Sequence, residues 1–172
     1  MDSINIASPL RYVIQFVVLV LIQVLICNNI LLFGVAVPFI FIYFIIALPL
    51  NTNLNVVISL SFFTGFLVDL FGDTLGLNCL ACLLLAVLRK PFFYAYMPKE
   101  DKFIAAIPGI GSMGWFNFIK YIITLSAIYC FIIFSIELFS FESFGRIVLM
   151  ASSSALFTLL VIIALDALFN KN

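Results

Sequence analysis

Three aspartates lie in apolar stretches of the chain, and they are the residues with the clearest potential for chemistry. Asp69 and Asp73 are four residues apart, and Asp166 lies near the C-terminus. Two carboxylates that share a proton would make an intramembrane aspartyl protease, whose Gly-x-Gly-Asp signature is nearly present before Asp73. The first glycine of that signature is missing, because Leu70 occupies its position. We therefore expect structural or partner-contact roles for these acids, and not catalysis by an aspartate pair.

Asp69 is the acid whose surroundings say most about its role. Ser61, Gly65 and Asp69 are spaced four residues apart, so they share one face of a helix and form a small-residue groove that leads to the carboxylate. Another helix can approach closely along such a groove. Asp69 can serve as a hydrogen-bonding hub between helices, as a protonation switch or as a ligand contact, and we favour the structural role. For Asp166 we expect an interfacial role, paired with Lys171 or with another span.

A tight turn follows Asp69. Gly72 and Gly76 bracket the polar sequence Asp73-Thr74-Leu75, and apolar sequence resumes at once. This pattern predicts a hairpin of two helices within a membrane. Asp73 is an expected N-terminal cap of the second helix, and Thr74 is the competing candidate. The candidate hairpin and partner-contact residues are Ser61, Gly65, Asp69, Gly72, Asp73 and Gly76.

The composition requires a membrane around these elements. Of the 172 residues, 66% are hydrophobic and 9% are charged, whereas soluble globular domains have roughly 45–50% and about 25%. The mean hydropathy is +1.32. Six spans of about 20 residues would use about 120 residues, which leaves no room for a separate soluble domain. We expect a single transmembrane domain over residues 1–172, an all-α bundle of six transmembrane helices.

Several kinds of chemistry are excluded or disfavoured. The chain has no histidine, which removes histidine-activated nucleophiles, histidine proton relays and histidine metal ligands. Cys79 and Cys82 form a lone Cys-x-x-Cys in apolar surroundings, for which we expect packing and not redox or metal chemistry. The basic residues are dispersed and the formal net charge is zero, so no nucleic-acid partner is expected. We expect no cofactor, no metal and no catalytic residue.

The apolar stretches place the six spans at residues 12–27, 35–48, 54–71, 75–88, 118–138 and 145–169. The first lacks an Ala-x-Ala-like cleavage site and is expected to be retained. Gln15 and Gln23 in that span should face other helices, since an unsatisfied amide in lipid is costly. Pro38 opens the second span, where a missing amide donor matters least. Ala151 and Ala155 give the last span a small-residue face suited to close packing.

Residues 89–117 are expected to form an interfacial loop on the cytoplasmic side. Arg89, Lys90 and Pro91 should stop the fourth span, with the basic side chains reaching the membrane surface. The stretch mixes charged residues with amphipathic aromatics, a composition typical of segments that lie on a membrane. Its glycine-rich part, from Pro108 to Gly114, lacks the spacing of a phosphate-binding loop.

The basic residues predict the orientation of the bundle. With the N-terminus inside, seven of the eight basic residues fall on the cytoplasmic side, and only Arg146 lies outside. The opposite side receives Asp73, Glu137 and Glu142. The positive-inside rule therefore predicts that both termini are cytoplasmic and that the Asp69 hairpin lies toward the external face.

Residues 47–77 resemble a known family. The stretch Ala47-Leu48-Pro49, a polar turn through Asn55, then Gly65-Phe66-Leu67-Val68-Asp69-Leu70, Gly72 and Leu75-Gly76-Leu77 is similar to the signature of MreD, the bacterial rod-shape-determining membrane protein family. Chain length and a wholly membrane-embedded build also fit, so the resemblance covers essentially the whole chain. Residues 92–117 and the last two spans match only in hydropathy.

The resemblance implies a non-enzymatic scaffold subunit of the cell-elongation machinery in the bacterial cell membrane, which contributes to cell shape. It implies association with MreC and, through MreC, with the MreB filament, RodA and the penicillin-binding synthases of lateral peptidoglycan. The family is also similar in fold to the six-helix substrate-binding subunits of ECF-type vitamin transporters, so a small-molecule-binding transporter subunit is the alternative. An intramembrane hydrolase is the third hypothesis. Gly65, Asp69, Gly72 and Gly76 carry over as motif residues that shape the hairpin, and no catalytic residue carries over.

Overall fold

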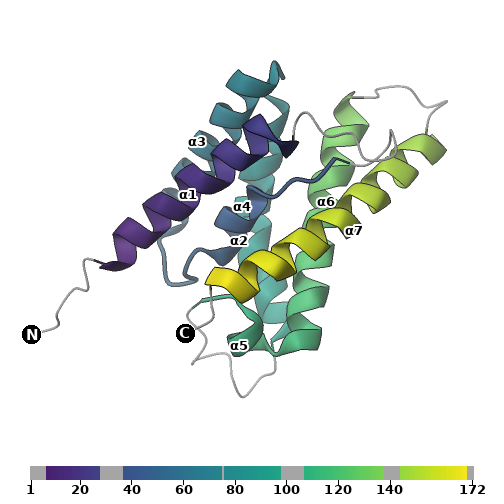
Figure 1. Cartoon of the computed structure of the whole chain (residues 1–172). Helices are drawn as coiled ribbons and strands as arrows, with labels where there is room; N and C mark the ends of the chain where they lie inside the picture. The colour runs from purple at the N-terminus through teal and green to yellow at the C-terminus, as the bar shows by residue number, and fades with distance from the viewer. Residues whose placement is uncertain (1–6, 28–36, 75, 98–106, 138–143, 170–172) are drawn as a thin grey trace, which may run out of the picture.

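The computed structural model describes residues 7–27, 37–74, 76–97, 107–137 and 144–169, and within these residues all regular secondary structure is helical (Figure 1). The helices in chain order are α1 (Ala7–Leu25), α2 (Ile42–Ala47), α3 (Leu54–Gly72), α4 (Leu77–Tyr96), α5 (Ile110–Met113), α6 (Trp115–Glu137) and α7 (Phe144–Phe169).

Four of these helices are long and apolar enough to cross a membrane: α3, α4, α6 and the part of α7 from Gly145 to Ala167. The apolar part of α1, Tyr12–Leu25, is shorter. The prediction of an all-helical membrane protein is confirmed at this level, and the bounds of α3, α6 and α7 lie within three residues of those expected. The count is four helices of spanning length in the described residues, and not six.

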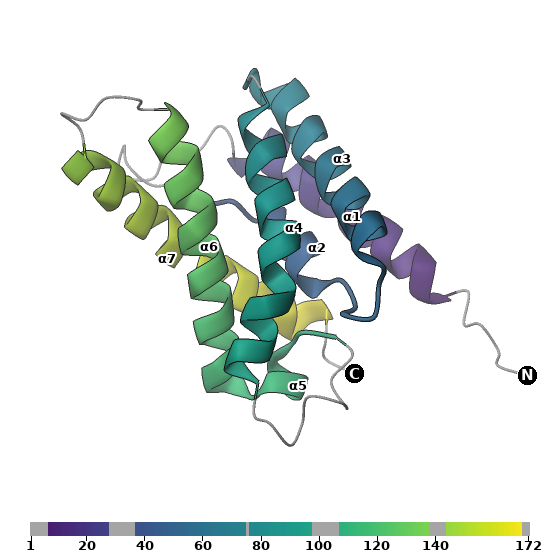
Figure 2. The ribbon, with the colours of Figure 1, turned by 180° about the vertical axis from the view of Figure 1, so that it is seen from behind.

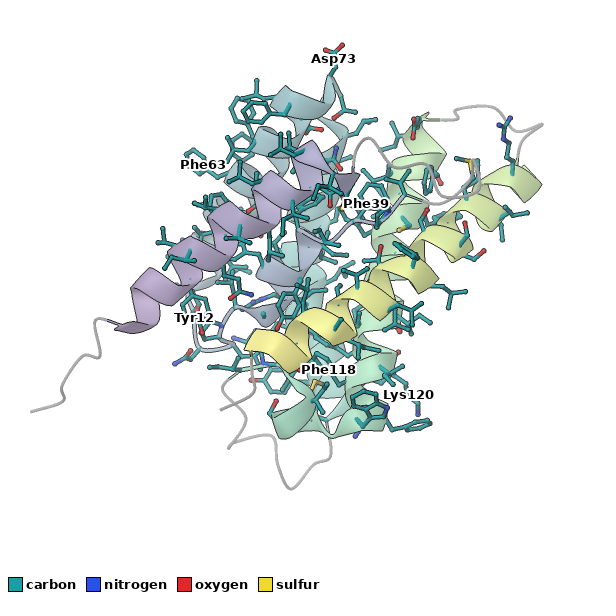
Figure 3. The ribbon with its side chains drawn as sticks, viewed as in Figure 1. Tyr12, Phe39, Phe63, Asp73, Phe118 and Lys120 are labelled. Atoms are coloured by element: carbon teal, nitrogen blue, oxygen red, sulfur yellow. The ribbon has the colours of Figure 1, made fainter. Side chains whose placement is uncertain are left out.

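The outer surfaces of the long helices carry large apolar side chains. Phe63 on α3 is 59% exposed and points away from the bundle (Figure 3). Phe62 and Phe66 stack on the same helix with ring centroids 6.0 Å apart, and Leu160 on α7 is exposed too. A soluble monomer rarely exposes so much apolar surface, so these faces suit contact with acyl chains.

The helix expected over residues 35–48 is wrong within the part that is described. Val37, Pro38 and Phe39 have no helical conformation, and α2 is only six residues long. Pro49 accounts for its end, because a residue before proline is driven out of the helical region, and Leu48 is extended with φ −60° and ψ 143°. Pro38 lies in the non-helical stretch and does not open a helix.

The short helix α2 lies inside the bundle. α3 packs against α4, α4 against α6, and α6 against α7, while α1 packs on α3. Figures 1 and 2, seen from opposite sides, both place α2 among these longer helices. All six residues of α2 are buried, so this segment is enclosed on every side by protein.

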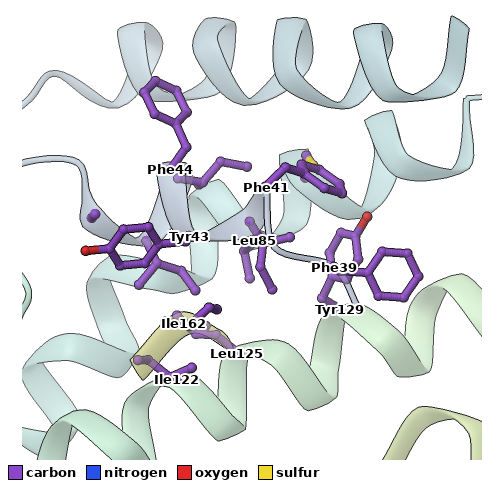
Figure 4. Close-up of a cluster of buried hydrophobic side chains, with 14 of the residues drawn as sticks. Phe39, Phe41, Tyr43, Phe44, Leu85, Ile122, Leu125, Tyr129 and Ile162 are labelled. Atoms are coloured by element: carbon purple, nitrogen blue, oxygen red, sulfur yellow. The ribbon is translucent and has the colours of Figure 1, made fainter. Parts of the chain in front are cut away.

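The core forms around α2 and the non-helical residues before it (Figure 4). The rings of Phe39 and Phe41 meet the ring of Tyr129 on α6 edge to face, with centroids 5.2 and 5.9 Å apart. Leu85 on α4 and Ile162 on α7 are buried in the same cluster. The second apolar stretch of the sequence is therefore the centre of the core and not one more lipid-facing helix.

The fourth span is longer than expected, and the interfacial loop is correspondingly shorter. α4 continues through Arg89, Lys90 and Pro91 to Tyr96, although the proline removes one helical hydrogen bond. Arg89 is only 2% exposed, so its side chain turns into the bundle and does not extend to the membrane surface. α5 and the start of α6 occupy part of the same stretch, while residues 98–106 and their four charged side chains lie outside the described residues.

Candidate functional site

Asp69 joins the end of α3 to the beginning of α4. Its Oδ1 accepts hydrogen bonds from the Thr74 hydroxyl, from the Asn78 backbone N–H at 3.1 Å and from Asn78 Nδ2 at 2.9 Å. Its Oδ2 accepts one from the Cys79 N–H at 2.9 Å. The carboxylate thus bonds two of the N–H groups that have no partner within α4, and its negative charge lies at the positive end of that helix.

This geometry supports the structural role for Asp69. All four partners are donors, which suits a carboxylate that accepts and does not donate. Asp69 is 6% exposed, so water has little access to the carboxylate and these protein donors take its place. The side chain is the hub of the hairpin.

At Gly65 the two helices of the hairpin lie in very close contact. A Cβ atom built on Gly65 would lie 2.6 Å from the Cα of Cys79 and 2.7 Å from the carbonyl oxygen of Asn78. Real Cβ atoms do not approach backbone so closely, so only glycine fits without moving a helix. The small-residue groove expected from the sequence is therefore filled by α4 of the same chain. Ser61 is completely buried, and no partner within the described residues bonds its hydroxyl.

The turn between the helices leaves one acid at the surface. Asp73 adopts the left-handed conformation with φ 53° and donates its backbone N–H to the Asp69 carbonyl. Its side chain is exposed at the end of α3 (Figure 3). Gly76 has φ +79° and is the N-cap residue of α4, which begins at Leu77. The expected cap by Asp73 or Thr74 is wrong: Asp69 bonds the N–H groups of α4, and Thr74 donates its hydroxyl to Asp69.

The hairpin is tied to α6 through Asn78. Asn78 Nδ2 also donates to the Thr74 hydroxyl oxygen at 3.1 Å, and its Oδ1 accepts a hydrogen bond from the Tyr129 hydroxyl. Both residues are buried. The polar network around Asp69 therefore links three helices: α3, α4 and α6.

A second buried network holds the non-helical residues before α2. The backbone N–H of Val37 donates to Ser154 Oγ, and that of Phe39 donates to Thr158 Oγ1, both at 3.0 Å. Figure 3 shows Phe39 beside α7, which carries both hydroxyls.

Gln23 completes this network from α1. Its Oε1 accepts from the Ile40 N–H at 2.9 Å, and its Nε2 donates to the Pro38 carbonyl at 3.1 Å. Non-helical backbone at membrane depth must find such partners inside the protein, because lipid supplies none. Gln23 therefore faces into the protein, as expected, but its partners lie in the non-helical segment and not in another helix.

Arg89 performs the matching role at the other end of α2. Its Nη1 donates to the carbonyls of Ile45 and Leu48 at 2.8 and 2.9 Å, and its Nη2 donates to the Pro49 carbonyl at 2.7 Å. A buried guanidinium at the C-terminal end of a helix satisfies carbonyls that have no helical partner and complements the negative end of the dipole.

Asp166 is also part of the support of α2. Its Oδ1 accepts from the Tyr43 hydroxyl at 3.0 Å, and its Oδ2 accepts from the Ile110 N–H at 3.2 Å. Asp166 is 1% exposed, so its carboxylate is buried inside the protein. Tyr43 belongs to the second apolar stretch, so Asp166 does bond a residue of another predicted span. Lys171, the other expected partner, lies outside the described residues.

A cavity of about 240 Å³ opens beside the hairpin turn. It lies between the non-helical segment, the turn and the last turn of α6, with one residue from α7. Its polar lining residues are Thr74, Asn78 and Glu137, and its apolar ones include Phe39, Phe134 and Met150.

The acids and thiols do not assemble into a reactive group. The described residues contain no cluster of three or more histidine, cysteine, aspartate or glutamate side chains suited to a metal. Asp69 and Asp166 belong to separate networks, and Asp73 faces outward. All four cysteines are free and buried, and the Cys79 thiol contacts the Phe62 carbonyl at 3.5 Å. The geometry supports hydrogen-bonding and packing roles for these groups.

The sequence interpretation did not identify Ser154, Thr158, Tyr43 and Arg89 as members of a site. The spacing of Ser154 and Thr158 places both hydroxyls on one face of α7, which was a readable signal of a polar stripe. Nothing local indicated which backbone they would bond. The sequence around Arg89 was misleading, because two basic residues followed by Pro91 suggest the end of a helix at the membrane surface.

Comparison of the chain with models of known protein families, with curated proteins and with solved structures found no significant match.

Proposed function

We propose that the chain is a non-enzymatic scaffold subunit of the bacterial cell-elongation machinery, of the MreD kind, which recruits an MreC-like partner in the cell membrane. The residues similar to the MreD signature support this proposal. The observation that carries it is the use made of Asp69: the one carboxylate in that stretch at membrane depth is fully occupied by four donors of its own hairpin. A residue used in this way builds shape and has no capacity left for a substrate.

The wider distribution of polar groups supports the same proposal. Gln23, Arg89, Ser154 and Thr158 all bond the backbone around α2. The polar interior thus maintains a particular internal arrangement, while the outward faces are apolar. Such a bundle suits recognition by surface complementarity between helices.

We further propose six crossings with both termini in the cytoplasm. α1 and the segment from residue 37 to residue 47 would add two crossings to the four long helices. Three non-helical residues at about 3.3 Å and eight turn or helical residues at about 1.5 Å give roughly 22 Å, about three quarters of a hydrocarbon core of about 30 Å. Asp73 and Glu137 would then face the outside, and Lys120 would face the cytoplasm.

Co-purification tests the scaffold proposal. The tagged chain, expressed in a rod-shaped bacterium and extracted in mild detergent, should retain an MreC-like protein. The Lys90→Met variant, which changes an exposed residue, should retain it equally, and Gly65→Leu should lose it together with the fold. A monodisperse, helical wild-type preparation that never retains an MreC-like protein would contradict the proposal.

The cavity beside the turn favours a second candidate, a small-molecule-binding subunit of a vitamin transporter. A pocket that combines aromatic walls with a few polar groups is the usual form of such a site. A vitamin that stays bound through purification, identified by mass spectrometry of the denatured sample, would reverse our preference for the scaffold.

A further inference from the structure

The cavity beside the α3–α4 turn is large enough for a small organic molecule. Its volume is about 240 Å³, whereas a cavity of about 150 Å³ accepts benzene. A single aromatic ring with a short chain and a polar head therefore fits.

One side of the cavity is an aromatic and aliphatic wall. The rings of Phe39 and Phe134 meet at 63° with centroids 6.3 Å apart, and Met150 reaches the cavity from α7. Phe39 is held by the hydrogen bond of its own N–H to Thr158. The wall is therefore formed before any ligand arrives, which lowers the cost of binding an apolar body.

The polar lining residues differ in whether they already have hydrogen-bond partners within the protein. The Thr74 hydroxyl and the Asn78 amide are engaged with Asp69, with one another and with Tyr129. Glu137 is the charged residue of the lining, and it is exposed. Among the described residues of the lining, Glu137 is therefore the polar side chain that is still available to a ligand.

The end of α3 adds to the negative character of this part of the cavity. α3 ends at Gly72, which lines the cavity together with Glu137. The C-terminus of a helix carries a partial negative charge, which favours a nearby cation. The N-terminus of α4 also reaches the cavity, but its Asn78 and Cys79 N–H groups are bonded to Asp69.

From this arrangement we propose that the cavity binds a small organic cation, with its ammonium group at Glu137 and its apolar body against Phe39 and Phe134. Neutral molecules of the same shape bind more weakly, and anions of the same shape are rejected. This site goes beyond the scaffold function and does not rest on it, since a partner protein could bind elsewhere on the bundle.

Three probes of one shape test the proposal: 2-phenylethylammonium, 2-phenylethanol and 3-phenylpropionate. Binding to the full chain in nanodiscs is measured by saturation-transfer NMR titration, with protein-free nanodiscs of the same lipid subtracted. We expect the ammonium probe to bind at least tenfold more tightly than the alcohol, and the carboxylate probe not to bind. Equal affinity for the ammonium and the alcohol, or binding of none of the three, would overturn the proposal.

Variants locate the site. Glu137→Gln should weaken the ammonium probe about tenfold and leave the alcohol unchanged. Asp73→Asn removes an acid at the same end of the bundle that does not line the cavity, and it should change neither affinity by more than about twofold. Met150→Trp, which fills the cavity, should abolish binding of both. If Asp73→Asn weakened binding of the ammonium probe as much as Glu137→Gln, the effect would be one of general surface charge and would contradict the proposal. This outcome does not depend on the result of the co-purification experiment.

Discussion

The α3–α4 hairpin and the segment around α2 both contain buried backbone groups that side chains must bond, but the bonding side chains come from different distances along the chain. Each contains backbone groups that have no partner within a helix, and each lies where lipid cannot supply one. In the hairpin, Asp69 bonds groups only five to ten residues further along the chain. Around α2 the partners are more than a hundred residues away for Val37 and Phe39, and about forty away for Arg89.

This difference in sequence separation has a structural consequence. In the hairpin, Asp69 and the backbone N–H groups that it bonds lie within one continuous stretch, and the two helices are in backbone contact at Gly65. The α2 segment depends on α1, α4 and α7 all being in place. We therefore expect substitutions in the hairpin to lower the free energy of unfolding most. Each substitution around α2 should remove one set of hydrogen bonds and have a smaller effect.

The largest effect should come from Gly65. Gly65→Leu should prevent folding, and Gly65→Ala should lower the free energy of unfolding by about 3 kcal/mol, because the new Cβ overlaps the α4 backbone. Denaturant titration in mixed micelles measures both. Gly145→Ala, where the added Cβ meets nothing within 4 Å, should change stability by less than about 1 kcal/mol. A stable Gly65→Ala variant would remove the claim that the hairpin is closed by backbone contact.

Substitution of Asp69 should rank next. Asp69→Leu should cost about 3 kcal/mol, because it leaves four donors without an acceptor in a buried site. Asp69→Asn should cost about half as much, since its oxygen can keep the bonds of Oδ1 while its amide nitrogen opposes the Cys79 N–H. The same titration, with Asp73→Asn as the exposed control, checks the order. Equal losses for Leu and Asn would point to a requirement for charge in place of hydrogen bonding.

Arg89 tests the C-terminal end of α2. Arg89→Met should cost about 2 kcal/mol, because three carbonyls lose their donors while a buried charge is also removed. Lys90→Met removes the same charge from the next residue, which is exposed, and should cost less than about 0.5 kcal/mol. If both variants cost the same, Arg89 would have no special part in holding α2.

The smallest effects should come from the hydroxyls of α7. Ser154→Ala and Thr158→Val should each cost about 1 kcal/mol, because each leaves one backbone N–H of the α2 segment without a partner. Ser153→Ala is the matched control, since within the described residues its hydroxyl bonds the Met150 carbonyl of its own helix and no group of the α2 segment. Losses at Ser154 and Thr158 no larger than at Ser153 would contradict the second network.

The same contrast explains what the sequence could predict. The hairpin was accessible from Ser61, Gly65 and Asp69, because spacing along one helix and a turn a few residues later decide its geometry. The long helices α6 and α7 were accessible from uninterrupted hydropathy. The side chains that replace the missing helical bonds were not, because Ser154, Thr158 and Arg89 come from helices far along the chain.

Two of the errors, in the second span and at Arg89, have one origin. Residues 35–48 are as apolar as a lipid-facing span, but the hydrophobicity of the described part, residues 37–48, reflects burial in protein, which hydropathy alone does not distinguish from burial in lipid. Arg89 was expected at the membrane surface for the same reason. The carbonyl oxygens to which it donates have no helical partner because α2 ends there, and the sequence did not predict that end. Polar residues spaced four apart in α7 were the one hint that an unwound segment needed partners.

Residue-specific amide exchange tests most directly whether buried side chains hold an unwound segment inside the bundle. In the wild type, the N–H of Phe39 should exchange as slowly as that of Cys79. In Thr158→Val, exchange at Phe39 should accelerate at least tenfold while Cys79 is unchanged. Fast exchange of Phe39 in the wild type, or equal acceleration at both amides, would contradict the account.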